Sequence, residues 1–480
     1  MMAMMHSRLL LVGLLALQGS CANISLNAKS TAERREQANG RLEGGGQLAA
    51  TAFRATAVAG LRQPVTTIKL GLVNLWHRPR EVVSANIPVD LNLQRLPAEA
   101  PGTPEFEKLL DRKGFPRAES GTVKWLVDGP GFFSELDRQI ASARRSIDVQ
   151  VFIFDNDDIA VRYADLLKRR SFELPVRVLF DDLGSTFAHT AAPETPGPRG
   201  FVPPAEMHGY LEADSKIDAR RTLNPWLVCD HTKLLVFDRQ TAILGGMNIG
   251  REYYSEWHDL MMRVEGPIVG SLSREFNRAW RKAGPAGDFA LFRKPAVFDR
   301  PAPSADGVPL RILRTDPAEG RHEILDATLR AIVAARRRIW IQTPYFAYDD
   351  IALACESAAR RGVDVRVILP SGGDSAMMQT GNVSTARGLI LAGAKVFHYP
   401  KMTHLKVTIC DDWATVGSAN LDTLSLRINR ELNLAFSDRA TVRELETTIF
   451  QPDFRRSRRV RLSETGSAAS AVAEALADQF

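Results

Sequence analysis

The sequence predicts an α/β protein made of two tandem sandwich domains, which are related by a pseudo-two-fold axis and preceded by an N-terminal extension. The segments 143–152 and 335–344 resemble one another at an offset of 192 residues (335 − 143). In both copies strand-like and helix-like stretches alternate, as they do in α/β folds. Repetition on this scale indicates a duplicated domain. At 480 residues the chain is also too long for one ordinary core.

The elements of each copy follow from local patterns. Helices are predicted at 159–170 and 351–361, and second strands at 176–179 and 365–368. Later in the first copy, 257–264 has the pattern of a strand, and 267–282 that of a helix with Pro in its first turn. The segment 430–436 is the matching strand of the second copy.

A short motif, H-x-K-x-x-x-x-D, occurs once in each copy, at 231–238 and 404–411. Its residues are His231, Lys233, Asp238, His404, Lys406 and Asp411. The four residues between Lys and Asp are apolar or β-branched, as in a buried strand. We therefore expect His and Lys to lie on that strand, and alternate residues of a strand share a face. A proton-transfer group beside a fixed positive charge suits phosphate chemistry.

The first 22 residues have the pattern of an export signal, with Arg8, an apolar run at 9–17 and small residues up to Ala22. The run is shorter than the roughly 20 residues that span a bilayer. Cleavage after Ala22 and lipidation of Cys21 both stay open. We expect an exported, membrane-associated protein at the periplasmic face; the alternative is a membrane anchor made by an uncleaved N-terminus.

The remaining boundaries follow from composition and from the repeat. They are a signal-like segment at 1–22, an N-terminal extension and linker at 23–120, a first domain at 121–300, a second domain at 301–462 and a C-terminal tail at 463–480. Within the extension, 47–61 and 66–76 are predicted to be helices. The segment 185–224 makes the first copy longer than the second and is predicted to be a structureless flap over the active-site mouth.

Composition limits the chemistry. A net charge of +6 fits an anionic partner, either nucleic acid or a phospholipid surface, without choosing between them. Cys229, Cys355 and Cys410 lie in core-like patterns and are odd in number, so a disulfide framework is not expected. Cys and His never show metal-ligand spacing, and the motifs lack clustered carboxylates. We expect chemistry without a metal or other cofactor.

The paired motifs, each followed by a Gly-rich turn and an Asn, resemble the phospholipase D superfamily. Within it, the segments 245–250, 264–269, 342–346 and 417–422 most resemble bacterial cardiolipin synthases. The resemblance covers about 122–454 and implies two tandem phospholipase D-like domains. Two features depart from it. The best-known members have a pair of N-terminal membrane helices, whereas this chain has a signal-like stretch. The second Gly-rich turn is one residue shorter than the first.

Two imidazoles can divide phosphodiester chemistry between them. Attack by one on phosphorus gives a phosphohistidine, and the other serves as acid and then base. We predict His231 as the nucleophile and His404 as the acid/base; because the motifs are near-symmetric, the reverse assignment stays open. Lys233, Lys406, Asn248 and Asn420 are expected to hold the phosphate oxygens, and Ser425 is a further candidate contact.

Carboxylates are expected to orient the imidazoles, since a nucleophilic His must keep one nitrogen free. Asp259 lies 28 residues after His231 (259 − 231), and Glu431 lies 27 after His404 (431 − 404). The resemblance gives these two acids the same role. Asp238 and Asp411 belong to the catalytic motif, but we expect them to fix the strand-to-turn geometry rather than touch substrate. His258, like the remaining histidines, is expected to be a core residue satisfied by backbone.

The predicted function is phosphatidyl transfer of the cardiolipin synthase type, through a phosphohistidine, to phosphatidylglycerol. Phosphatidylethanolamine is a further candidate substrate, and the membrane surface is an expected partner. The alternative is a phospholipase D that hydrolyses phospholipids to phosphatidic acid. A phosphodiester nuclease is a third interpretation; the export signal, the ordinary basicity and the lack of aromatic-interleaved basic stretches count against nucleic acid as a partner.

Overall fold

The computed structural model describes residues 46–84, 98–190, 197–292, 306–373 and 376–466. The predicted export signal and the lipidation site at Cys21 lie outside these ranges, as does most of the predicted tail. Within the described ranges, no helix combines the length and the apolarity needed to cross a bilayer.

The strands fall into two sets that follow the repeat. The first set is β1 (Glu119–Val127), β2 (Ile147–Val151), β3 (Val176–Asp181), β4 (Asp218–Thr222), β5 (Leu234–Phe237), β6 (Thr241–Gly245) and β7 (Leu260–Glu265). The second set is β8 (Val308–Asp316), β9 (Arg321–His322), β10 (Arg338–Gln342), β11 (Asp364–Pro370), β12 (Lys395–Tyr399), β13 (Val407–Cys410), β14 (Trp413–Gly417), β15 (Glu431–Phe436) and β16 (Arg458–Arg459).

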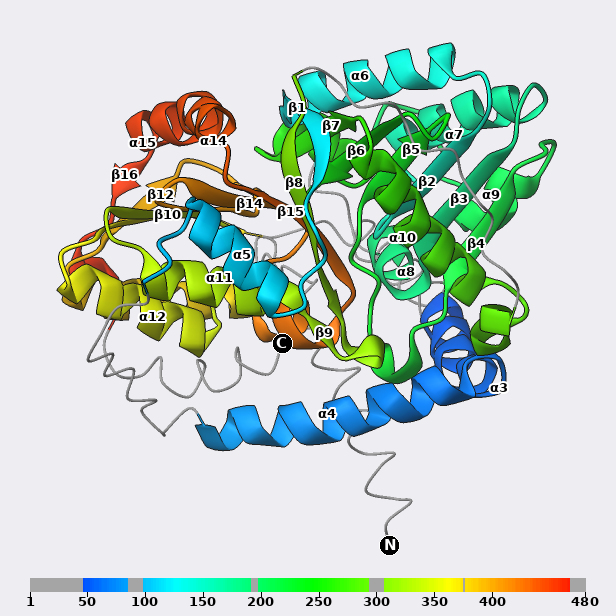
Figure 1. The fold of residues 1–480 in the computed structure, drawn as a ribbon. Helices are drawn as coiled ribbons and strands as arrows, with labels where there is room; N and C mark the ends of the chain where they lie inside the picture. The colour runs from blue at the N-terminus through cyan, green and yellow to red at the C-terminus, as the bar shows by residue number, and fades with distance from the viewer. Residues whose placement is uncertain (1–45, 85–97, 191–196, 293–305, 374–375, 467–480) are drawn as a thin grey trace, which may run out of the picture.

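All these strands belong to one continuous sheet. The first half has the order β4-β3-β2-β5-β6-β7-β1, and the second half repeats it as β12-β11-β10-β13-β14-β15-β8. The halves join where β1 pairs antiparallel with β8, at Gly121 opposite Val308. β16 adds to the outer edge of the second half, and β9 pairs with β8. The predicted fold, two tandem α/β domains related by a pseudo-two-fold axis, is confirmed (Figure 1).

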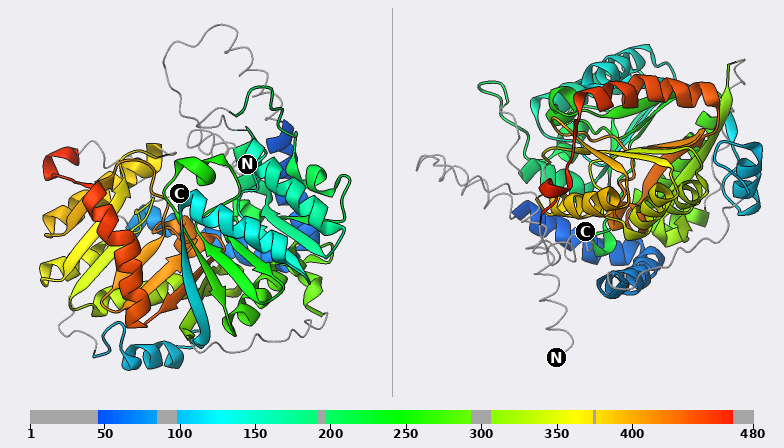
Figure 2. Two further views of the ribbon diagram at one scale, coloured as in Figure 1. Left: turned by 90° about the horizontal axis from the view of Figure 1, so that it is seen from above. Right: turned by 90° about the vertical axis from the view of Figure 1, so that its left-hand side faces the viewer.

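Helices cover both faces of the sheet (Figure 2). In the first half they are α6 (Asp128–Ser142), α7 (Asp158–Ser171), α8 (Asp182–Thr190), α9 (Met207–Glu212) and α10 (Ile268–Ala283). In the second half they are α11 (Glu323–Ala334), α12 (Asp349–Arg360), α13 (Ala376–Leu391), α14 (Arg439–Leu445) and α15 (Gln451–Arg456). Helix α10 and helix α14 share one apolar cluster with the strands of both halves, so the two halves have a common core.

Short 3₁₀ or π turns link these elements. They are η1 (Arg54–Val58), η2 (Pro225–Leu227), η3 (Glu252–Glu256), η4 (Gly287–Phe292), η5 (Pro317–Glu319), η6 (Leu424–Ile428), η7 (Glu446–Phe450) and η8 (Leu462–Glu464).

The N-terminal extension packs on the body as helices. Residues 46–53 are helical and lead through η1 and α3 (Ala59–Arg62) into α4 (Pro64–Ser84), where the sequence predicted helices. Helix α5 (Pro104–Arg112) packs on the second half, with Phe106 edge-on to Trp413 at 6.0 Å between ring centroids. The extension therefore contacts both halves.

The segment 185–224 is not the structureless flap that the sequence predicted. It contains most of α8, all of α9 and β4, which extends the sheet by pairing parallel with β3. Apolar side chains from it, such as Met207 and Leu211, are fully buried in the first-half core. The Thr, Pro and Gly content concealed these elements because it is concentrated between them.

The motif aspartates end the strands that follow the histidines. Asp238 and Asp411 have left-handed φ of 55° and 52°. Asp411 accepts hydrogen bonds from the backbone amides of Arg336, Arg337 and Arg338 at 3.0, 2.8 and 3.1 Å. Asp238 does the same for three successive amides in the first half, those of residues 144–146. Both carboxylates thus bind the loop before β2 or β10 and lie at the far end of the strand from the histidine.

We expect Asp411→Ala to lower the melting temperature by several degrees, because three amides lose their acceptor and alanine disfavours a positive φ. The combined loss is about 2–4 kcal/mol. Asp411→Asn is the matched control: it keeps one acceptor and tolerates the left-handed conformation, so it should lose less. Thermal unfolding followed by circular dichroism measures both. An alanine variant that melts with the wild type would rule out this role.

Candidate active site

The sequence predicted that the two motif histidines lie on strands. In the structure they lie just before those strands. β5 begins at Leu234 and β13 at Val407, so each His and Lys belongs to the preceding extended segment. These segments pair with the opposite half. His231 N donates to Arg430 O at 2.9 Å, and His404 N donates to His258 O at 2.7 Å. Each motif is therefore fixed by backbone from the other domain.

A carboxylate from the opposite half holds each imidazole. His231 Nδ1 lies 2.9 Å from Glu431 Oε1, and His404 Nδ1 lies 2.7 Å from Asp259 Oδ2. The sequence spacing had placed each acid beside the histidine of its own half, and that pairing is wrong. When the carboxylate is ionised it can only accept, so Nδ1 then carries the proton and Nε2 is left for chemistry.

Glu431 is held by hydroxyls as well as by the imidazole. Ser418 Oγ donates to it, and Ser418 Oγ also accepts from Leu432 N at 3.0 Å. The Ser425 side chain opposes the rise that burial causes in the pKa of Glu431 and of Asp422, and its amide donates to Asp422 Oδ1 at 2.7 Å. The serine expected to contact phosphate thus contacts the orienting acid. Ser418 lies in the Gly-Ser-Ala-Asn turn after the second motif, and this position was the sequence signal that could have identified it.

Asp259 is held by a backbone hydrogen bond and packs closely against Gly246. Its Oδ1 accepts from Leu260 N at 2.7 Å. A Cβ on Gly246 would lie 2.3 Å from the same oxygen, so this position of the Gly-rich turn admits no side chain without moving the acid. This close approach explains the second glycine of the turn.

Aromatic rings surround the imidazoles. Phe152 meets His231 edge-on at 4.7 Å between ring centroids, while Trp257 and Tyr253 lie 5.1 and 5.6 Å from the ring of His404. No sequence motif marks these three side chains. They exclude water from the ring faces, and the histidine side chains are only 12% and 7% exposed.

Both motif lysines are buried and turned back onto their own histidines. Lys233 Nζ donates to His231 O at 2.7 Å, and Lys406 Nζ donates to His404 O at 2.6 Å. Burial lowers the pKa of Lys233 to about 7, against the opposing effect of Glu431. A bound anion would favour the charged form, because it supplies the counter-charge that burial removes.

Electrostatics show that the two motifs share one site. Burial lowers the pKa of both imidazoles well below the usual value, and each is lowered further by both Lys233 and Lys406. Burial raises the pKa of Asp259 and of Glu431 to about 7, while the lysines oppose it. Two imidazoles, two carboxyl groups and two lysine side chains thus converge from the two domains.

The two motif asparagines differ. Asn248 is engaged by protein: its Oδ1 accepts from Ile153 N at 3.0 Å and its Nδ2 donates to the Tyr253 hydroxyl at 2.8 Å. Asn420 Oδ1 is buried without a hydrogen-bond partner among the described residues. One amide proton of Asn248 stays available for a ligand, since an amide nitrogen carries two.

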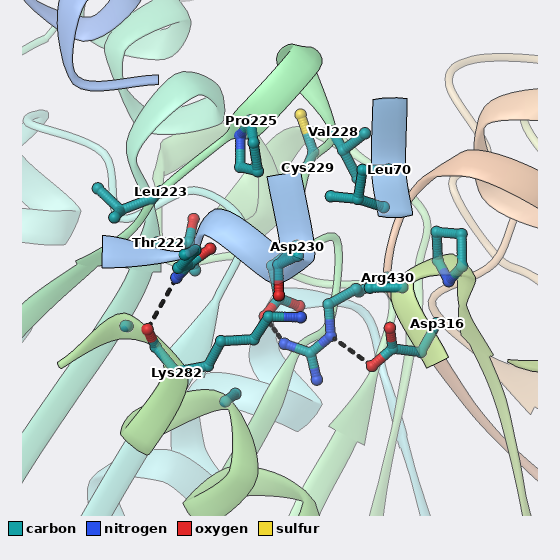
Figure 3. Close-up of a pocket in the computed structure, with 16 residues that line it drawn as sticks. Leu70, Thr222, Leu223, Pro225, Val228, Cys229, Asp230, Lys282, Asp316 and Arg430 are labelled. Carbon is teal, nitrogen blue, oxygen red and sulfur yellow. Dashed lines mark hydrogen bonds and ion pairs between the residues drawn. The ribbon is translucent and has the colours of Figure 1, made fainter. Parts of the chain in front are cut away.

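A cation precedes each orienting acid and joins the halves. Arg430 donates to Asp230 Oδ2 at 2.6 Å and to Asp316 Oδ2 at 3.3 Å (Figure 3). At the equivalent position, His258 Nδ1 lies 2.7 Å from an oxygen of Asp128 and Nε2 lies 2.8 Å from one of Asp453. His258 is therefore held by two carboxylates, and its expected satisfaction by backbone is wrong. His258 directly precedes the orienting acid Asp259, and this position was the sequence signal that could have shown its role.

The pocket in Figure 3 lies next to this site, between α4 and the body. It has a volume of about 40 Å³ and is lined by Leu70, Val228, Asp230, Lys282 and Arg430, among others. A cavity of this size holds a few water molecules. It is too small for a phospholipid.

One group of carboxylates among the described residues could hold a metal ion. Asp155, Asp157 and Glu252 have oxygens within 4.8 Å of one another. Burial, together with the other two acids, raises the pKa of Asp155 to about 8. The catalytic motifs contribute no residue to this group.

Comparison with known proteins identifies similar chains. The family model described as "Cardiolipin synthase, PLD-like domain" matches residues 136–280 and 328–452. Cardiolipin synthase A of Pseudomonas aeruginosa (strain LESB58) is 32% identical over 370 residues, covering 73% of this chain and 72% of the relative. Cardiolipin synthase A of Pseudomonas putida (strain W619) is 30% identical over 361 residues, covering 72% and 71%.

Among solved structures, a phosphatidylserine synthase from Haemophilus influenzae Rd KW20 has a TM-score of 0.59, covering 78% of this chain and 97% of that chain. At 14% identity, this likeness concerns the fold alone.

We expect His258 to make stability depend on pH. Burial alone would lower the pKa of His258, but its bonds to Asp128 and Asp453 outweigh burial and raise the pKa to about 9. Because the folded-state pKa exceeds the ordinary value of 6.5, the added stability is fully present below that ordinary value. It is lost as the pH rises through 9 and amounts to roughly 3 kcal/mol at most.

Melting temperatures of wild type and His258→Gln between pH 6 and 10 check this expectation. The wild type should lose stability near pH 9, and the variant should start lower and lack that step. His258→Arg, which copies Arg430, should keep the cation at every pH tested. Parallel profiles for wild type and His258→Gln would contradict the assignment.

Proposed function

We propose that this chain, which belongs to the cardiolipin synthase family of phospholipase D-like enzymes, transfers a phosphatidyl group to phosphatidylglycerol through a phosphohistidine. The crosswise pairing of His231 with Glu431 and of His404 with Asp259 carries the proposal. It supplies two imidazoles, each with Nδ1 engaged, to one buried site. Two-step displacement needs this arrangement, because one group must attack phosphorus while another moves protons.

In the first step His231 Nε2 attacks the phosphorus of a donor phospholipid. A phosphorus–nitrogen bond forms while the bond from phosphorus to the headgroup oxygen breaks, and the leaving oxygen takes the proton from His404 Nε2. Burial favours the neutral form of both imidazoles, because it lowers their pKa well below the usual value. The negative charge of the bound phosphodiester favours the protonated form of His404 that this step needs.

In the second step the neutral His404 takes a proton from a hydroxyl of phosphatidylglycerol. The resulting oxygen attacks phosphorus as the bond to His231 breaks, which leaves two phosphatidyl groups on one glycerol. Lys233 and Lys406 act on the non-bridging oxygens, with Asn248 and Asn420 as further donors. Ser425 acts through Glu431 in this mechanism.

Because the site is buried from bulk solvent, an alcohol is favoured over water as the acceptor. Both histidine side chains are largely buried, and rings of Phe152, Tyr253 and Trp257 cover them. Exclusion of bulk water suppresses hydrolysis of a reactive phosphohistidine. Phospholipid substrates also place the enzyme at a membrane surface, and we propose that it is exported and works there.

Product analysis with defined lipids tests the function. Purified protein is given unlabelled phosphatidylglycerol, alone or with headgroup-labelled phosphatidylethanolamine, and nucleic acid in a separate trial. We expect cardiolipin, and release of labelled ethanolamine would make phosphatidylethanolamine a donor. Phosphatidic acid as the main product would replace transfer with hydrolysis, and shortened nucleic acid would indicate a nuclease.

A substrate with a good leaving group separates the two histidines. With a phosphatidyl p-nitrophenol, His404→Ala should release one equivalent of p-nitrophenol and retain the phosphatidyl group on His231, detected by mass spectrometry. On natural lipids its turnover should fall about 10²- to 10⁴-fold. His231→Ala should give no burst, and His398→Ala on β12 is the control that should behave as wild type. A group trapped on His404 in His231→Ala would reverse the roles.

A further inference from the structure

Helix α4 turns its apolar side away from the protein. Its outward side chains Val65, Ile68, Leu72 and Leu75 are spaced by three or four residues and so form one stripe. Phe53 and Leu61, on the preceding turns, are exposed as well, and the six side chains are 52–81% exposed. We name these six residues the apolar strip. A surface helix normally buries its apolar stripe, so the orientation of α4 is reversed.

The inner face of α4 is fixed by specific contacts. Thr66 donates to Asp288 through its amide at 2.8 Å and through its hydroxyl at 2.5 Å, and Trp226 Nε1 donates to Thr67 O at 2.8 Å. Leu70 packs in a small buried cluster. The strip is therefore held outward by the fold and is not the free side of a loosely attached helix.

Exposed apolar residues are concentrated on the helical segment 46–84, which we name the arm. Twelve large apolar side chains are exposed in the part of the chain that the structure describes, and the apolar strip supplies six of them. An exposed apolar stripe such as the one on α4 marks an interaction site.

The charged residues of the arm indicate which kind of partner the apolar strip binds. Between Glu43 and Glu81 the sequence contains five Lys or Arg residues and no Asp or Glu; one of the five, Arg54, pairs with Asp182 at 2.6 Å. Arg62 and Lys69 are exposed beside the strip. An apolar stripe flanked by cations is typical of helices that lie in the headgroup region of a bilayer. A second copy would set like charges against each other, whereas an anionic lipid surface complements them.

The position of α4 links such a surface to the active site. In Figure 1 the helix runs along one edge of the molecule, beneath both halves. It contacts η2, η5 and η6, and Leu70 packs with Val228 and Ile428. Val228 lies three residues before His231 (231 − 228), and Ile428 lies three residues before Glu431 (431 − 428). One helix diameter, about 10 Å, separates the strip from these segments.

We propose that the apolar strip docks on an anionic phospholipid bilayer and holds the catalytic segments of both domains at the lipid headgroups. The inference rests on the proposed function for the identity of the substrate. The docking itself rests on the apolar strip and on the charge of the arm.

A fluorescent label on the full chain tests the docking directly. The label is attached at Leu72→Cys, with Leu391→Cys at the end of α13 in the second half as the control, since Leu391 is 62% exposed. On addition of phosphatidylglycerol vesicles, we expect the label at position 72 to shift to the blue and to be quenched by brominated lipids. The label at position 391 should do neither. Any separate anchor at the N-terminus leaves this contrast intact.

Other results would overturn the proposal. If vesicles neither shift nor quench the fluorescence of the label at position 72, bilayer contact is excluded. A label already shielded without vesicles means that protein covers the strip: a second copy if dilution frees it, and another segment of this chain if dilution does not.

Activity assays separate this inference from the proposed function. Ile68→Ser/Leu72→Ser should lose about tenfold or more in turnover of vesicle lipids, because two apolar side chains no longer enter the bilayer. It should keep wild-type turnover of a water-soluble short-chain phospholipid. Phe172→Ser/Leu391→Ser removes the same number of exposed apolar side chains elsewhere and should change neither. Loss of turnover on both substrates by the strip variant would contradict docking, while lack of lipid turnover by the wild type would contradict the proposed function alone.

Discussion

Each domain supplies the carboxylate that the other domain's histidine needs, and the site depends on this exchange. Glu431 holds His231, and Asp259 holds His404. A buried carboxylate and a buried imidazole are each costly alone, because burial disfavours charge and leaves polar atoms unpaired. Paired across the interface, they satisfy one another only when both domains are in register. The continuous sheet, joined at β1 and β8, supplies that register.

The pseudo-symmetry is close in backbone and looser in chemistry. Both orienting acids follow a cation that joins the halves, but the cation is Arg430 in one copy and His258 in the other. An arginine stays charged throughout the accessible pH range, whereas His258 can lose its proton. The acids differ too: Glu431 is held by serine hydroxyls and Asp259 by a backbone amide against Gly246. The two imidazoles therefore lie in different surroundings despite their equivalent positions.

Much of the fold could be predicted from sequence, because the repeat and the spacing of the two motifs are local signals. The cross-domain pairing could not. Spacings of 28 and 27 residues suggest partners within one copy, and only the sheet order brings Asp259 to His404. The helices in 185–224 were hidden by turn residues, although Met207 and Leu211 carry the apolar pattern. For α4 the apolar spacing predicted a helix, but periodicity does not say which face is covered.

The cross-domain exchange can be measured directly by ¹⁵N NMR of histidine-labelled protein, comparing wild type with Glu431→Gln. The variant keeps the shape of the acid and removes its charge. We predict that the imidazole resonances of His231 move, since its Nδ1 proton loses an anionic acceptor, while those of His404 stay in place. A spectrum in which Glu431→Gln moves His404 and leaves His231 unchanged would contradict the exchange of carboxylates between the domains.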